Sequence, residues 1–182
     1  SVCLGYNEKT GENARCGGWG HLLADEGSGY IIGLEALKAV LHEYDQRGPQ
    51  TGLTQRIIET LGLNSPTDIV GWTYMSGNGK TEVAALGRLV HEEAQKGDQV
   101  SRHILDVQSD ELIAILRPVY MRLFKENEEV ELALWGGNLM NSEIYRDLFL
   151  DKLAKCDLNV KAVIKDEQAM VGAAQHMLNN LK

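Results

Sequence analysis

Residues 16–33, with the sequence CGGWGHLLADEGSGYIIG, bring together groups that could bind a carbohydrate. Gly18 and Gly20 have no Cβ, so a ligand can reach their backbone N–H and C=O groups directly. Trp19 lies between them and offers a flat apolar face on which a sugar ring can rest. Asp25 offers carboxylate oxygens to sugar hydroxyls. The alternative is a structural loop whose tryptophan belongs to the core and whose acids favour the N-terminus of the next helix.

A second candidate site, residues 134–142 with the sequence LWGGNLMNS, comes at the end of a predicted strand. The paired glycines Gly136 and Gly137 would let a ligand lie against the backbone. The next helix, capped by Asn141 or Ser142, would present N–H groups that have no partner within the helix. A tight strand-to-helix turn without a ligand explains the same residues, so both interpretations stay open.

Two further motifs are weaker. Residues 76–81, SGNGKT, resemble a phosphate-binding loop, but Tyr74 stands where that fingerprint requires a glycine. We therefore predict a polar turn at the start of a helix. The His–Glu pairs at 42–43 and 91–92 lack the second histidine of a zinc-protease helix, so no metal site is predicted.

Composition predicts an ordinary globular domain. The chain has 182 residues, of which 43% are apolar and 24% charged, enough for one domain with its own core. A net charge of -8 argues against a nucleic-acid partner. No apolar run approaches the roughly 18 residues of a membrane helix. Three cysteines without a CxxC pair favour reduced thiols, and hence a cytoplasmic location. The chain has no initiator methionine and opens on a strand-like pattern, which is typical of a chain cut from a longer one.

Hydrophobic spacing and turn residues predict the elements that would position these sites. Residues 1–16 are expected to form a hairpin, and strands are expected at 130–138 and 159–164. Helices are expected over residues 28–47, 51–62, 65–75, 81–96, 98–125, 142–155 and 166–178. Pro118 should kink the long fifth helix. Because helices and strands alternate in the second half, we predict an α/β fold with a parallel or mixed sheet covered by helices.

Residues 17–33 resemble the signature of the N-acetylglucosamine kinases, within the BadF/BadG/BcrA/BcrD ATPase family of the actin/hexokinase/Hsp70 superfold. The resemblance continues through residues 92–105, 134–145 and 166–178, in the family's order. It implies a ribonuclease-H-like (actin-like ATPase) domain with a mixed sheet covered by helices, plus extra helices. It also implies that residues 1–182 are the C-terminal domain of a two-domain sugar kinase, and that the N-terminal domain carries the general base.

The same resemblance implies ATP-dependent phosphorylation of an amino sugar, N-acetylglucosamine first, with Mg²⁺. The expected partners are the amino sugar, ATP and the protein's own N-terminal domain, and a homodimer is left open. The chain alone is expected to be inactive. Its implied sugar contacts are Gly18, Trp19, Gly20 and Asp25. Its implied nucleotide contacts are Ser1 at the phosphates and Ala84, Gly137, Asn138 and Ser142 at the adenosine.

One residue departs from the family pattern. Val2 stands where the animal enzyme has an asparagine that contacts the sugar, so another amino sugar, or a muramic-type sugar, stays open. Two other functions also stay open: an ATPase that activates an iron–sulfur dehydratase, and a sugar-binding regulator without enzymatic activity.

Overall fold

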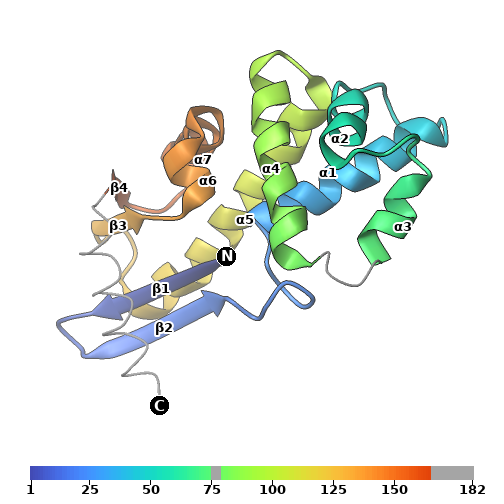
Figure 1. Ribbon diagram of the computed structural model, residues 1–182. Helices are drawn as coiled ribbons and strands as arrows, with labels where there is room; N and C mark the ends of the chain where they lie inside the picture. The colour runs from blue at the N-terminus through green and yellow to red at the C-terminus, as the bar shows by residue number, and fades with distance from the viewer. Residues whose placement is uncertain (75–78, 165–182) are drawn as a thin grey trace. The chain divides into compact units, whose positions relative to one another are not determined.

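The computed structural model describes residues 1–74 and 79–164. They form two compact units (Figure 1). The first unit contains residues 1–25 and the described residues from Ser109 onward, and the second contains residues 26–108. Helix α5 (Gln99–Leu123) contributes residues to both. The predicted helix at 166–178 lies outside the described residues.

The first unit begins with the predicted hairpin, which is confirmed. Strands β1 (Val2–Asn7) and β2 (Glu12–Gly17) pair antiparallel, with Cys3 directly opposite Cys16. The buried Asn7 organises the turn, because its Oδ1 accepts hydrogen bonds from the Lys9 and Thr10 N–H groups at 2.9 and 3.3 Å. Its Nδ2 donates to the Leu123 carbonyl at the end of α5, which joins the hairpin to that helix.

The remaining strands of the first unit form a parallel pair, β3 (Val130–Leu134) and β4 (Val160–Ile164). Helices α6 (Gly137–Asn141) and α7 (Glu143–Lys155) connect them, as the predicted strand–helix–strand order requires. Sequence periodicity missed α6, because five residues are too few to show it. The core under this pair consists of Leu116, Tyr120, Leu134, Phe149, Leu153 and Leu158. The α/β class is confirmed, with one antiparallel and one parallel strand pair in the described residues.

The second unit is helical: α1 (Gly29–Tyr44), α2 (Leu53–Leu61), α3 (Asp68–Tyr74), α4 (Lys80–Gln95) and the first part of α5. The predicted start of the first helix at residue 28 and the predicted end of the second at residue 62 are confirmed, because both residues cap their helices. Ser28 Oγ accepts from the Ile31 N–H at 3.3 Å, and Gly62 is left-handed with φ +64°. Helix α1 ends before the predicted stop at Gly48, because Gln46 adopts the left-handed conformation, with φ +58°.

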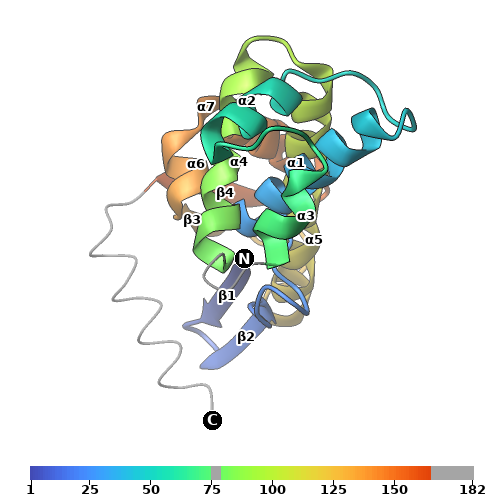
Figure 2. The same ribbon diagram turned by 45° about the vertical axis from the view of Figure 1, so that its right-hand side comes forward.

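Helices α1 and α4 pack backbone against backbone (Figures 1 and 2). A Cβ added at Gly33 would lie 2.0 Å from the Val83 carbonyl oxygen. A Cβ added at Gly87 would lie 3.3 Å from the carbonyl oxygen of Gly29. The glycines at the end of the 16–33 stretch therefore serve helix packing, whereas the earlier ones shape a loop.

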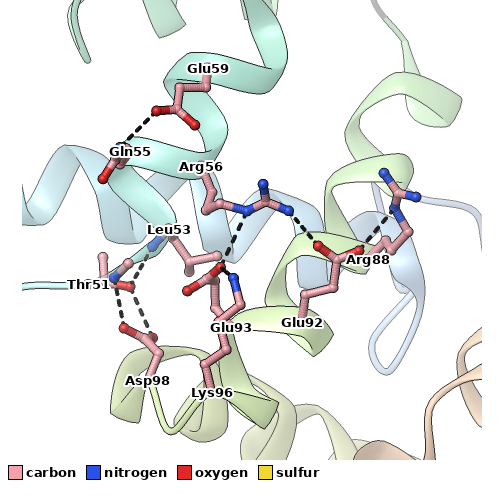
Figure 3. A network of polar contacts seen from close by, with 11 residues as sticks. Thr51, Leu53, Gln55, Arg56, Glu59, Arg88, Glu92, Glu93, Lys96 and Asp98 are labelled. Carbon is pink, nitrogen blue, oxygen red and sulfur yellow. Dashed lines mark hydrogen bonds and ion pairs between the residues drawn. The ribbon is translucent and has the colours of Figure 1, made fainter.

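A network of charged and polar groups joins α2 to α4 and to the start of α5 (Figure 3). Arg56 of α2 reaches both Glu92 and Glu93 of α4, at 2.6 and 3.3 Å. Asp98 accepts hydrogen bonds from the Gly52 N–H at 2.9 Å and from the Ser101 N–H at 2.7 Å. Residues 92–98 belong to one of the strings that carry the family resemblance, and their contacts here stabilise the fold.

Burial raises the pKa of the Asp98 carboxyl, but the hydrogen bonds from Ser101, Gly52 and Thr51 outweigh it, so the pKa lies below its ordinary value of 3.8. Asp98 also serves as the N-cap of α5, because Ser101 is the third residue of that helix.

We predict that Gly33→Ala lowers the free energy of unfolding by about 3 kcal/mol or more, because the new methyl group would overlap the Val83 carbonyl. Gly71→Ala in α3 is the matched control, since a Cβ there meets nothing within 4 Å. It should stabilise the protein by about 0.5–1 kcal/mol through helix propensity. Urea unfolding of both variants measures the contrast, and equal effects would contradict the close packing of α1 on α4.

We predict that Asp98→Ala lowers the free energy of unfolding by about 1–2 kcal/mol at pH 7. Because the folded-state pKa is depressed, this contribution is complete above the unfolded pKa near 3.8 and is lost as the pH falls through the folded value. The difference between wild type and variant should therefore shrink in urea titrations from pH 7 to pH 3. Asp151→Ala, an exposed carboxylate on α7, is the control. A pH-independent difference would refute the assignment.

Candidate functional site

The loop after β2 turns back on the first residue of the chain. Gly17, Gly18 and Gly20 all have left-handed backbone conformations, with φ of +78°, +74° and +90°. The Gly18 N–H donates to the Ser1 carbonyl at 2.7 Å. A Cβ on Gly17 would lie 2.8 Å from that same oxygen, so both conformation and space require glycine there. Residue 1 and the start of the loop are thereby held together.

Trp19 is exposed at the surface of this loop. Its side chain is 62% exposed, which rules out the alternative that it belongs to the core. The guanidinium carbon of Arg15 lies over the indole, 4.4 Å from the ring centroid. An aromatic face held by a neighbouring strand and open to solvent is suited to binding the apolar face of a ring.

Asp25, in contrast, is only 8% exposed. Its Oδ1 lies against the terminal nitrogen of residue 1, so Asp25 is next to the residue whose carbonyl accepts from Gly18. The Gly20 carbonyl accepts from the N–H groups of Leu23 and Ala24 at 3.1 and 3.0 Å and closes a tight turn between Trp19 and Asp25. The implied sugar contacts thus lie in one loop, and the implied phosphate contact, Ser1, lies against that loop.

The second candidate site lies between β3 and α7. Gly136 has φ +117°, a conformation that favours glycine, and Gly137 is exposed. The Asn138 carbonyl accepts from the Ser142 N–H at 3.1 Å. Ser142 is buried and is the N-cap of α7, because its Oγ accepts from the Tyr145 N–H at 3.3 Å. Of the two predicted caps, Asn141 and Ser142, the structure therefore selects Ser142.

The implied site residues are divided between the two units. Ser1, Gly18, Trp19, Gly20 and Asp25 belong to the hairpin and its loop, and Gly137, Asn138 and Ser142 to the β3–α7 connection, all in the first unit. Ala84, partly buried on α4, is in the second unit. The motif at 76–81 is described only from Gly79, where Glu82 Oε2 accepts from the Gly79 N–H at 2.7 Å as part of a helix cap.

Sequence reasoning missed two features of this region. Arg15 was not a candidate, although a cation four residues before an exposed tryptophan in a tight loop can reach the ring. Cys3 and Cys16 face each other across the hairpin, which follows from its register. Burial and the nearby Cys16 thiol raise the pKa of Cys3 to about 12.

Metal and membrane features can be judged for the described ranges, 1–74 and 79–164. There, no three His, Cys, Asp or Glu residues lie close enough together to hold a metal ion. None of the helices in these ranges combines the length and apolar character that crossing a bilayer requires.

Comparisons with known proteins identify relatives along nearly the whole chain. Residues 3–175 match the model of the BadF/BadG/BcrA/BcrD ATPase family. The chain is 39% identical over 173 residues to the N-acetylmuramic acid/N-acetylglucosamine kinase of Clostridium acetobutylicum, covering 95% of this chain and 56% of that protein. It is 37% identical over 186 residues to the N-acetyl-D-glucosamine kinase of Dictyostelium discoideum, covering 100% of this chain and 57% of that protein.

Solved structures share the fold. A candidate N-acetylglucosamine kinase from Chromobacterium violaceum matches with a TM-score of 0.72 at 22% identity, over 91% of this chain and 52% of its own. A second, from Porphyromonas gingivalis, matches with a TM-score of 0.63 at 21% identity, over 93% of this chain and 54% of its own. The chain therefore spans little more than half the length of its relatives. The resemblance inferred from residues 17–33 is confirmed: the chain belongs to the BadF/BadG/BcrA/BcrD ATPase family.

Proposed function

We propose that the protein transfers the γ-phosphoryl group of ATP to a hydroxyl of an N-acetylated amino sugar, with N-acetylglucosamine as the first candidate. The observation that carries this proposal is the identity of 39% and 37% with two amino-sugar kinases, over 95% and 100% of this chain. The second of these matches covers the whole chain, the glycine-rich loop included, and the geometry of that loop suits a carbohydrate.

In this proposal the loop of residues 17–25 binds the sugar. The exposed Trp19 indole supports the C–H face of the ring, and the left-handed Gly18 and Gly20 leave room for the ring to approach the backbone. Asp25 accepts hydrogen bonds from sugar hydroxyls. Charge-assisted bonds of this kind are directional, so Asp25 would fix which hydroxyl faces the nucleotide.

The nucleotide would bind at two further places. Ser1, which contacts both Gly18 and Asp25, would lie beside the phosphates. Gly137, Asn138 and Ser142 would border the adenosine, and Ala84 stays a prediction for the same group. The resemblance places the general base in an N-terminal domain of the same polypeptide, and we propose that this domain also contributes ligands to Mg²⁺ bound with the phosphates. Closure of the two domains would exclude water.

N-acetylmuramic acid is a second candidate substrate. One relative is named as a kinase for this sugar as well as for N-acetylglucosamine. Val2, which stands where the family pattern has a sugar-contacting asparagine, leaves a muramic-type sugar open but does not distinguish the two substrates. Both substrates share the ring and the acetylamino group and differ by a lactyl ether that bears a carboxylate.

When ATP and N-acetylglucosamine are both present, the full-length protein should form one ADP for each N-acetylglucosamine phosphate. A panel of N-acetylglucosamine, N-acetylmuramic acid, glucosamine and glucose, analysed by mass spectrometry, tests this. Turnover of ATP without any phosphorylated sugar would reject the kinase function in favour of an ATPase of another kind.

Asp25→Asn should lower kcat/KM for the sugar by about 10–100-fold, because a charged acceptor for hydroxyls is lost. Trp19→Ala should raise the KM for the sugar with little change in melting temperature, since the exposed indole adds little to the core. Asp151→Asn and Tyr44→Ala, an exposed carboxylate and an exposed aromatic away from the loop, serve as controls. Unchanged sugar kinetics in both loop variants would remove this loop from the site.

A further inference from the structure

The contact of Arg15 with Trp19 has no part in the function proposed above. Arg15 lies on β2, two residues before the loop begins, and its guanidinium carbon is 4.4 Å from the centroid of the exposed indole. In the described part of the chain, no carboxylate forms an ion pair with Arg15. Stacking uses the flat face of a guanidinium and leaves the N–H groups at its edge able to donate.

The sequence places few cations close to this loop. Arg15 is the only lysine or arginine between Lys9 and Lys38, a span that includes the whole candidate sugar loop. The chain as a whole carries a net charge of -8, which repels anions at long range. An anionic substrate at this loop therefore requires a local positive charge, and the Arg15 guanidinium over Trp19 is placed to supply it. Arg122 is a second cation near β2, because its Nη1 donates to the Arg15 carbonyl at 3.5 Å.

We infer that Arg15 is a specificity-determining residue whose guanidinium binds the carboxylate of an acidic N-acetylated amino sugar resting on Trp19. A guanidinium and a carboxylate match in planar, two-bond geometry, which makes arginine selective for this group. The substrate class is thus an amino sugar that carries a carboxylate on a substituent of the ring. This inference rests on the proposed function, because it assumes that the ring lies on Trp19.

Orienting the indole is the alternative role for Arg15. In that case the loss of the guanidinium would weaken the binding of every sugar equally, whether neutral or charged. A direct contact with the carboxylate predicts a loss confined to the acidic sugar. The two roles therefore predict different ratios of kcat/KM for the acidic sugar to kcat/KM for a neutral sugar. A general structural defect would leave this ratio unchanged.

The test uses Arg15→Met and Arg15→Lys in the full-length protein. Methionine keeps an apolar contact with the indole but removes the charge, whereas lysine keeps the charge and loses the planar fork. Arg47→Met, an exposed cation in the second unit, is the matched control. The substrates are N-acetylmuramic acid, its methyl ester and N-acetylglucosamine, and the ester removes the charge of the acid at the cost of one added methyl group.

We expect Arg15→Met to lower kcat/KM for N-acetylmuramic acid by about tenfold or more, mainly through KM. In the same variant, kcat/KM for the ester and for N-acetylglucosamine should change by less than about threefold. For N-acetylmuramic acid, the kcat/KM of Arg15→Lys should lie between those of the wild type and Arg15→Met. Equal losses for all three sugars, or no loss for the acid, would overturn the inference.

Binding measured by calorimetry separates this result from a failure of the proposed function. If the wild type phosphorylates no sugar, the kinase proposal fails. The inference then stands if wild type binds N-acetylmuramic acid more tightly than its ester and Arg15→Met abolishes that preference. It fails if the wild type shows no preference for the acid, or if the preference survives in the variant.

Discussion

The backbone contact between residue 1 and the loop after β2 is the interaction on which the candidate site depends. The Ser1 carbonyl accepts from the Gly18 N–H at 2.7 Å, and a Cβ on Gly17 would lie 2.8 Å from the same oxygen. The start of the loop, directly before Trp19, is therefore fixed against the residue that precedes β1. In the proposed function Ser1 also lies beside the phosphates, so a shift of that contact would move the sugar contacts with it.

Glycine has two separate purposes within residues 16–33. Gly17, Gly18 and Gly20 allow backbone angles that other residues rarely adopt, and so they shape the loop. Gly33 instead sits within α1 in a standard helical conformation and allows contact with the backbone of α4. A glycine count cannot distinguish these purposes. The many glycines that first suggest a ligand site therefore include some that serve helix packing in the second unit.

Local signals in the sequence predicted most of the fold. The hairpin, the Ser28 cap, the Gly62 stop and the strand–helix–strand order all depend on residues close together in the chain. Errors arose where contacts between residues far apart in the sequence decide which side chains are buried. Within α5, for example, Val107 is exposed whereas Leu105 is fully buried, although both are apolar. The residue types were enough to find the loop residues of the site. The contacts of Asp25 with Ser1 and of Arg15 with Trp19 could not be predicted, because they depend on the path of an irregular turn that has no sequence periodicity.

The acidic character of the chain is less of an obstacle to anionic ligands than its net charge suggests. Some of its carboxylates accept hydrogen bonds from backbone N–H groups: Asp98 from Gly52 and Ser101, and Glu82 from Gly79. Such pairing moderates the local negative potential, because part of each charge is compensated within about 3 Å. In the inference above, the Arg15 guanidinium over Trp19 is the local donor that a carboxylate would meet. A donor at contact distance acts without the screening that weakens the field of distant surface charges, so it can outweigh the net charge in selecting an anion.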